Sequence, residues 1–224
     1  MRLLQNLSLR VFCLLAVLFL VASGALAQQV FLNEVDADSY TVPDSLEFVE
    51  LFGAPDQPLD GHIVVFYKGG GSVLTSTAYA AFDLHGFQTD SAGFFLLANP
   101  QVGGADIEFE PGLLRDGGDA VALFEGDSAD FPFGALLTTN GLLDAVVYGT
   151  ADQTNPFLID SLTPGQPQLD EWMLGVDNGS ALAWARLPDG GPAFGSDQMV
   201  LQQPTPGATN VLDCDGGLIS AQGA

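Results

Sequence analysis

Short runs of β-branched, aromatic and other apolar residues recur along the chain, whereas helical periodicity is scarce. Several of these runs have the length and composition of β-strands. They are Val30–Val35, Leu46–Phe52, His62–Tyr67, Tyr79–Leu84, Phe94–Ala98, Ala120–Glu125, Leu142–Tyr148 and Ala181–Leu187. Turn-forming stretches such as Gly53–Asp56 and Asp116–Asp119 separate them. Many short strands, in a chain with 27 glycines and 13 prolines, predict an all-β sandwich.

Two of the predicted strands are apolar without interruption. Ile63–Tyr67 and Phe94–Leu97 contain no polar position to face solvent, a pattern typical of strands covered on both faces. Residues 155–170, by contrast, contain proline and glutamine and predict a long surface loop. Residues 212–224 carry no core signal, so we expect a disordered tail.

Acidic residues interrupt the first two strands. In an extended strand Glu50 shares a face with Phe48 and Phe52. By the same two-residue spacing, Glu34 shares a face with Leu32 and Asp36. If such a face points inward, each carboxylate needs a hydrogen-bond donor or a cation, because burying it bare costs several kcal/mol. The two glutamates are therefore expected to be partly buried strand residues with dedicated partners.

The N-terminal residues 1–27 have the layout of a secretory signal peptide. Arg2 and Arg10 precede an apolar run, Val11–Ala22, and Ala25–Ala27 forms a small-x-small cleavage site. A membrane anchor is the alternative, but the run is short of the roughly 20 apolar residues that a bilayer span needs. Cleavage leaves residues 28–211 as one sandwich domain followed by the tail, without a transmembrane anchor. The expected location is outside the cytoplasm, as a secreted protein that is extracellular, periplasmic or at the cell surface.

The charge balance is strongly acidic. The mature chain keeps three bases, Lys68, Arg115 and Arg186, against all 28 acids, which leaves a formal charge of −25. Direct nucleic-acid binding is therefore disfavoured, because affinity for phosphate backbones comes from lysine and arginine. Cations, basic partners or a saline medium suit such a surface, but solubility outside the cell is the simpler explanation of the charge. Since Cys13 leaves with the signal peptide, Cys214 has no intramolecular disulfide partner.

Ordered motifs extend along nearly the whole mature chain, over residues 30–210. Asn33-Glu34 stands in the first strand and Glu47–Leu51 in the second. Further stretches follow in a fixed order: Leu59–Tyr67, Ala81–Phe95, Gly118–Phe124, Leu143–Tyr148 and Pro204–Asn210. Together they resemble the lamin tail domain in its bacterial, secreted form. The resemblance implies an immunoglobulin-like β-sandwich in which Asn33, Glu34 and Glu50 are structural motif residues. It also implies a binding or targeting module that engages an extracellular or envelope partner.

The residues themselves offer no constellation for catalysis. There is no Gly-x-Ser-x-Gly elbow, and the only imidazoles, His62 and His85, belong to different predicted elements. The requirements of nucleophile, base and oxyanion donor are not met, so we expect no enzymatic activity. Because bacterial lamin-tail-like modules stand beside nucleases and phosphatases, an accessory module of such an enzyme is an alternative.

Cation binding is the best chemistry that the sequence offers. Calcium takes six to eight oxygen ligands from carboxylates and carbonyls. One candidate is the loop that contains Asp36, Asp38 and Asp44, with Glu47 nearby; a second is the stretch between Asp83 and Asp90. Neither matches an EF-hand loop, and solvated acidic loops are the competing interpretation. A calcium-dependent structural or adhesive domain is thus a further alternative.

Overall fold

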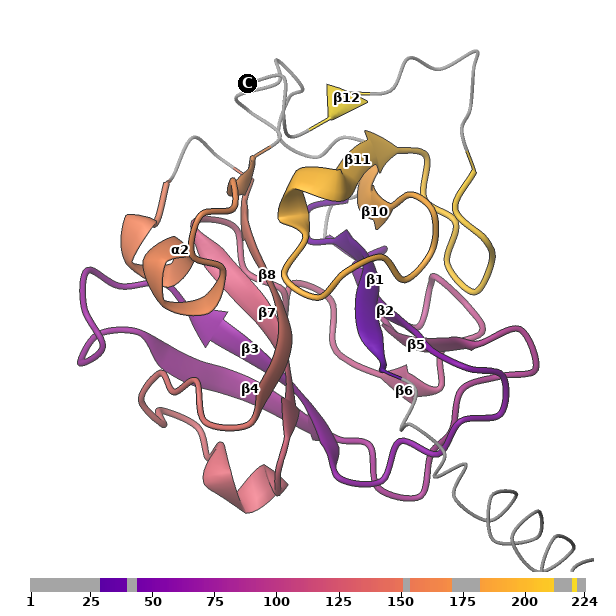
Figure 1. The fold of residues 1–224 in the computed structure, drawn as a ribbon, viewed down its shortest axis with the longest axis horizontal. Coiled ribbons are helices and arrows are strands. Elements are labelled where there is room, and N and C mark those ends of the chain that lie inside the picture. Colours follow the sequence, from indigo (N-terminus) through magenta and orange to yellow (C-terminus); the bar gives the residue numbers. More distant parts are fainter. Residues whose placement is uncertain (1–28, 40–43, 151–153, 171–181, 212–218, 221–224) are drawn as a thin grey trace, which may run out of the picture.

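The computed structural model describes residues 29–39, 44–150, 154–170, 182–211 and 219–220. The predicted signal peptide lies outside these ranges, as does most of the predicted tail. In the described part, the strands form a seven-stranded sheet, ordered β12-β11-β10-β1-β2-β5-β6, and a five-stranded sheet, ordered β4-β3-β7-β8-β9 (Figure 1). The strands are β1 (Phe31–Asp36), β2 (Phe48–Phe52), β3 (His62–Lys68), β4 (Thr77–Asp83), β5 (Phe94–Ala98), β6 (Ile107–Glu108), β7 (Asp119–Glu125), β8 (Leu142–Gly149), β9 (Leu169–Asp170), β10 (Ala183–Arg186), β11 (Met199–Gln202) and β12 (Ile219–Ser220).

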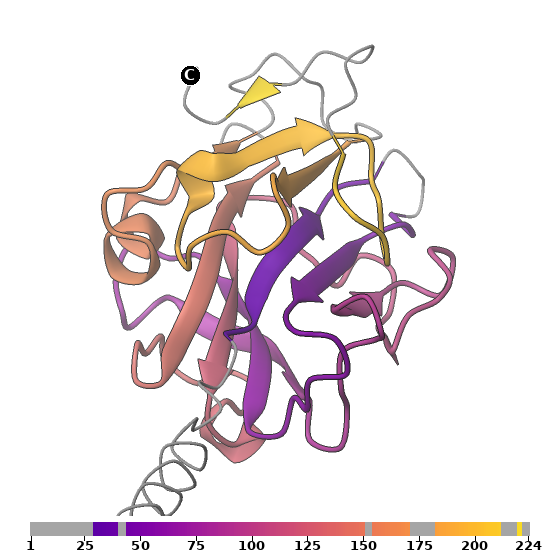
Figure 2. The same ribbon diagram turned by 45° about the vertical axis from the view of Figure 1, so that its right-hand side comes forward.

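The chain begins and ends its sandwich in the same sheet. β1 pairs antiparallel with β2 on one side and with β10 on the other, so the C-terminal strands lie beside the N-terminal one (Figure 2). All neighbouring strands are antiparallel except the pairs β5–β6 and β8–β9. This closure brings residues near 190–210 over residues near 34–50, which places the site described below.

The main core lies between the two sheets. It contains Leu51 and Phe95 from the seven-stranded sheet and Val64, Leu123 and Val146 from the five-stranded sheet, all fully buried. The predicted all-β sandwich is therefore confirmed, while the immunoglobulin-like topology stays a prediction.

The outer faces of the sheets are also covered. Ile63, Val65 and Tyr67 point away from the main core and join a second cluster under helix α2 (Pro156–Leu162). Phe48 and Leu96 belong to a third cluster on the outer face of the seven-stranded sheet. The uninterrupted apolar runs are thus strands buried on both faces, as their pattern predicts.

The prediction of a long surface loop over 155–170 is wrong. This stretch contains α2, whose first turn is capped because the Asn155 side chain accepts a hydrogen bond from Leu158 N at 3.0 Å. Pro156 occupies the first turn, where its missing N–H costs nothing. Leu158 and Leu162 are buried against the five-stranded sheet, and that packing stabilises a helix too short to persist alone. Of the predicted tail, only Ile219–Ser220 is described, and it pairs with β11.

A buried ion pair joins the two sheets. Arg186 Nη2 on β10 lies 2.8 Å from Asp144 Oδ2 on β8, and the two side chains are 1% and 0% exposed. The Arg186 Nε–H donates to Leu32 O at 2.6 Å, and Leu32 N donates back to Asp144 Oδ2 at 3.0 Å. Burial raises the pKa of Asp144, and the Arg186 charge and the backbone hydrogen bonds to the carboxylate act against that rise.

Candidate functional site

A β-bulge in β1 sets the direction of the acidic side chains. The pairing of β1 with β2 shifts register between Leu32 and Glu34, which leaves Asn33 as the extra residue. As a result Leu32 faces the main core, whereas Glu34 faces the opposite side of the sheet. The simple alternation that places Leu32 and Glu34 on one face is therefore wrong at this point.

Glu34 and Glu50 meet on the outer face of the seven-stranded sheet. Their Cα atoms are cross-strand partners, and both residues are fully buried. Asn33 Nδ2 donates to Glu50 Oε1 at 2.8 Å, and Asn33 Oδ1 accepts from Gly190 N at 2.9 Å. The three residues that the family resemblance marks as structural thus form one buried polar group.

The segment 203–207, here called the proline loop, covers these glutamates. Thr205 donates to Glu34 twice, from its N–H and from its hydroxyl, each at 3.0 Å. Gly207 N donates to Glu50 Oε2 at 2.6 Å. Pro204 and Pro206 have no backbone N–H to donate. The hydrogen bonds that hold the loop on the glutamates therefore come from Thr205 and Gly207.

Burial changes the protonation of both glutamates. Removal from water raises the pKa of Glu34 to about 7, although the two hydrogen bonds from Thr205 lower it. Burial likewise raises the pKa of Glu50 to about 8, against the hydrogen bonds from Asn33 and Gly207, and the charges of Glu34 and Asp189 raise it further. The pair consequently changes its charge near neutral pH.

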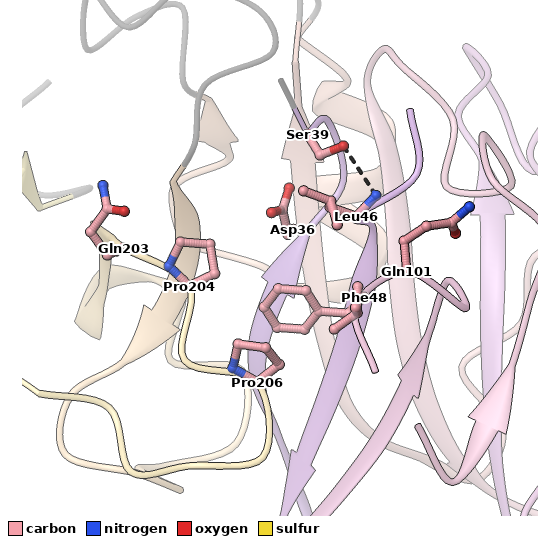
Figure 3. Close-up of a pocket in the computed structure, with 9 residues that line it drawn as sticks. Asp36, Ser39, Leu46, Phe48, Gln101, Gln203, Pro204 and Pro206 are labelled. Carbon is pink, nitrogen blue, oxygen red and sulfur yellow. Dashed lines mark hydrogen bonds between the residues drawn. The ribbon is translucent and has the colours of Figure 1, made fainter. Parts of the chain in front are cut away.

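A pocket of about 370 Å³ lies along the proline loop (Figure 3). Its lining residues come from β1 and the turn after it, from the start of β2, and from the segments that follow β5 and β11. They are Asp36, Ser39, Leu46, Phe48, Gln101, Val102, Gln203, Pro204 and Pro206. We call it the proline-loop pocket.

The lining of the proline-loop pocket is mostly apolar and includes one carboxylate, that of Asp36. In the view of Figure 3, the side chains of Asp36 and Phe48 lie between the two prolines on one side and Leu46 on the other. Asp36 is 3% exposed and Phe48 is 1% exposed. The pocket therefore offers apolar walls and an acidic group that is shielded from bulk water.

The predicted cation loop is only partly assembled. Asp38 and Asp44 each bring a carboxylate oxygen into one group with Asp116, all within 4.8 Å of one another. Asp36 belongs to the proline-loop pocket instead. Asp44 Oδ1 also accepts from Ser39 N at 2.9 Å, and burial raises the Asp44 pKa. The group could hold a hard cation, with Asp116 as the ligand that sequence reasoning missed.

Glu47 lies buried near this acidic group. Its Oε2 accepts from Gly112 N at 2.8 Å and from Leu113 N at 3.2 Å, while its Oε1 has no hydrogen-bond partner among the described residues. Burial raises the Glu47 pKa to about 8, and the charge of Asp44 adds to this rise. A bound cation would offset that cost by stabilising the ionised form.

The second predicted cation site, between Asp83 and Asp90, is divided between two turns. Asp83 Oδ1 accepts from His85 N at 2.9 Å, so it caps its own turn. Asp90 Oδ1 accepts from Ala92 N at 2.8 Å and from Phe94 N at 2.9 Å, which holds the turn into β5. Both carboxylates therefore have local structural roles.

Sequence reasoning missed the Asp144–Arg186 pair and the proline-loop pocket. A signal for the pair exists, because an arginine in Ala183–Arg186 and an aspartate in Leu142–Gly149 each interrupt a strongly apolar strand. No comparable signal exists for the pocket, since its segments are far apart in the chain.

In the described residues, no helix combines the length and apolar character required to cross a bilayer. The chain matches no known protein-family model, no curated protein and no solved structure, so its resemblance to the lamin tail domain rests on sequence motifs alone.

Proposed function

We propose that this chain is a secreted, non-catalytic β-sandwich module of the lamin-tail type, which binds an extracellular or cell-envelope ligand in the proline-loop pocket. The observation that supports the proposal most strongly is the set of hydrogen bonds that holds the proline loop, which forms one wall of the pocket. Two fully buried glutamates, Glu34 and Glu50, anchor the proline loop through Thr205 and Gly207. Burying a carboxylate costs free energy. Two such residues holding one surface loop therefore suggest that the position of the loop matters for function.

The pocket also has the dimensions and lining of a binding site. Ligand pockets in proteins span about 300–1,000 Å³ and combine apolar walls with a few polar groups. The proline-loop pocket, at about 370 Å³, falls at the lower end of that range. It suits a side chain or a small chemical group that belongs to a larger partner.

The nature of the lining favours binding over catalysis. Neither histidine contributes to the pocket: His62 Nδ1 lies 3.3 Å from Leu59 O, and His85 Nδ1 lies 2.9 Å from Asp60 Oδ1. Ser39, the hydroxyl that does line the pocket, shares a hydrogen bond with Asp44 rather than with an imidazole base.

The test fills the pocket and measures ligand capture. Residues 28–224 with Gln101→Trp, which blocks the rim from an exposed position, are compared with Gln88→Trp, an exposed glutamine outside the pocket. Both variants should melt like the parent protein. Binding to envelope and culture-medium fractions should fall at least tenfold with Gln101→Trp and stay unchanged with Gln88→Trp. Equal binding by both variants would refute the proposed site.

A calcium-dependent structural role is a second candidate, favoured by the convergence of Asp38, Asp44 and Asp116. A native-only site raises the melting temperature by mass action when calcium is added. The rise should appear at millimolar Ca²⁺ and disappear with Asp116→Asn, which alters an exposed ligand. Asp130→Asn, an exposed acid elsewhere, is the control. A melting temperature that Ca²⁺ leaves unchanged would exclude this role.

A further inference from the structure

We infer that the proline loop is a pH-controlled lid, which lies closed on the sheet while the Glu34–Glu50 pair retains a proton and lifts when both carboxylates are ionised. The inference rests on the proposed binding function, because the loop forms one wall of the proline-loop pocket and its movement would regulate that site. Four features support it: the attachment of the loop, the turn at its tip, the hydrogen-bond chain at Thr205, and the charges around the pair.

The attachment of the loop to the sheet runs through the two glutamates. Among the described residues, the hydrogen bonds that join residues 203–207 to β1 and β2 are those from Thr205 to Glu34 and from Gly207 to Glu50. The loop lies at the surface, where Gly207 is exposed and Thr205 is half-buried, whereas both glutamates beneath it are fully buried. A thin surface segment therefore covers two carboxylates, and lifting it would return both to water.

The tip of the loop is a turn that can move as a unit. Ala208 N donates to Thr205 O at 2.9 Å, which closes the turn around Pro206 and Gly207. Gly207 has a φ of 74°, as the third position of a type II turn requires, and proline is favoured at the second position. Because the turn makes its own hydrogen bond, lifting the loop breaks its contacts with the glutamates and leaves the turn intact.

The hydrogen-bond chain at Thr205 has a place for a proton on Glu34. The Thr205 hydroxyl has one hydrogen but two acceptors within reach, Asn210 Oδ1 at 2.7 Å and Glu34 Oε2 at 3.0 Å. When that hydrogen goes to Asn210, the contact with Glu34 is a hydrogen bond only if the carboxyl supplies a hydrogen of its own. A protonated Glu34 thus satisfies both contacts, whereas an ionised Glu34 competes with Asn210 for one hydrogen.

Three acids lie close together under and beside the loop. Glu34 and Glu50 are cross-strand partners, and like charges in that position repel. Burial is the main reason that the pKa is raised to about 7 at Glu34 and to about 8 at Glu50, and the charge of Asp189 adds to both rises. Opening the loop would hydrate the pair, so ionisation is easier in the open state than in the closed one.

The other elements around the pair offer no compensating charge among the described residues. Strands β5 and β11 and residues 203–207 contain no ionisable side chain. On β1, Asp36 is a further acid two residues from Glu34. On β10, the strand beside β1, Arg186 is paired with Asp144. The buried pair is therefore relieved by protonation or by water.

The direction of the switch follows from proton linkage. In the open state the carboxylates are hydrated, and their pKa values return towards 4.5. Between that value and the raised values, the closed state binds more protons than the open state. The open fraction therefore increases as pH rises, by up to about tenfold per pH unit for each glutamate. The increase ends near the higher pKa, about 8. The pocket wall is thus held most firmly in acid.

Hydrogen exchange measures the opening without a ligand. In residues 28–224, NMR gives the protection factors of the Thr205 and Gly207 amides between pH 5 and pH 8.5, with buried Val64 in β3 as the reference. We expect the protection of both loop amides to fall at least about thirtyfold over this range. It should also be insensitive to low urea, because a local opening exposes little surface, whereas that of Val64 should decrease.

Two results would overturn the lid. Protection of the loop amides that is independent of pH would show that the glutamates do not control it. Loop amides that follow Val64 in urea would show that the loop leaves the sheet only when the whole domain unfolds.

Glu34→Gln assigns the pH dependence to the pair. The amide keeps both contacts with Thr205 but does not titrate, so the fall in loop protection between pH 5 and pH 8.5 should shrink about tenfold or more. Glu125→Gln, at the exposed end of β7, should behave like the parent protein. Equal pH profiles in the two variants would refute the role of the pair. If Glu34→Gln fails to fold, the profiles of the parent and of Glu125→Gln still decide whether the lid responds to pH.

Methyl resonances connect the lid to the pocket. Leu46 and Val102 line the pocket from other segments, and their shifts should follow the pH profile of the loop amides. Methyl shifts that stay constant while the loop amides respond would show that the lid does not regulate the pocket. A flat exchange profile would remove the lid and leave the binding function, which the Gln101→Trp comparison tests separately. Equal capture by Gln101→Trp and Gln88→Trp would remove the binding site, while the exchange profile would still support or refute the lid.

Discussion

Glu34 and Glu50 lie directly opposite each other on β1 and β2, fully buried, and together they hold the proline loop. Thr205 N is 3.0 Å from Glu34 Oε1, and Gly207 N is 2.6 Å from Glu50 Oε2. Like charges in directly opposed cross-strand positions destabilise a sheet. Burial is the main reason that the pKa values of Glu34 and Glu50 are raised to about 7 and about 8, and the charge of Glu34 adds to the rise at Glu50.

The pair predicts that stability decreases as pH rises. The pKa of Glu34 is 4.5 in the unfolded chain and about 7 in the folded protein, so between these values the folded protein binds more protons. The free energy of unfolding therefore falls as pH rises through this window, by about 3 kcal/mol for Glu34. Urea denaturation between pH 5 and pH 8.5 measures the slope.

Glu34→Gln should flatten that slope. The amide can accept the Thr205 N–H and donate to the Thr205 hydroxyl, so it keeps both contacts without a charge. We expect the variant to be more stable than the parent at pH 8 and similar at pH 5. Glu125→Gln, at the exposed end of β7, controls for the general loss of negative charge. A parent protein whose stability increases with pH would contradict the assignment.

The ion pair between the sheets predicts a severe effect of a single substitution. Arg186→Met leaves Asp144 as a buried, uncompensated carboxylate, which costs about 3–5 kcal/mol. Arg115→Met removes a partner of Asp119 but changes a residue whose side chain is 47% exposed, so its cost should stay below about 1 kcal/mol. Denaturant midpoints of the two variants provide the comparison, and similar values would show that the buried pair does not matter.

Two glycines in one loop should respond differently to alanine. A Cβ at Gly69 would overlap the carbonyl oxygen of Gly118 and the side chain of Asn155, the residue that caps α2. Gly69→Ala should therefore cost about 1–3 kcal/mol through overpacking. Gly71→Ala meets nothing within 4 Å and should leave stability unchanged or slightly increased. Comparison of the melting temperatures of the two variants tests whether Gly69 packs closely against Gly118 and Asn155.

The packing of α2 on the five-stranded sheet predicts that a buried and an exposed leucine differ in their contribution to stability. Leu158 is fully buried against the five-stranded sheet, and Leu158→Ala should cost about 2–5 kcal/mol. Leu136 is 49% exposed, so Leu136→Ala should cost under about 1 kcal/mol. If chemical denaturation finds equal losses, α2 does not contribute to the cooperative core.

Local pattern was sufficient to predict most strands. Ile63–Tyr67 and Phe94–Leu97 are identifiable as strands because their uninterrupted apolar residues must be buried on both faces. In the folded protein, other segments pack against both faces of these strands. The two-residue strands β6, β9 and β12 carry too few residues for a pattern, and α2 is stabilised chiefly by the sheet on which it packs.

The order of residues alone is enough to predict the all-β class, the excess of acidic residues and the carboxylates in the first two strands. Which of these acids act together depends on contacts between segments that are distant in the chain. A bulge at Asn33 turns Glu34 away from the core, and the pairing of β1 with β10 brings Thr205 and Gly207 over the glutamates. Asp36 joins Pro204 in the same way, across more than 160 residues of chain. Strand pairing between distant segments creates these contacts, and no local pattern encodes which segments will meet.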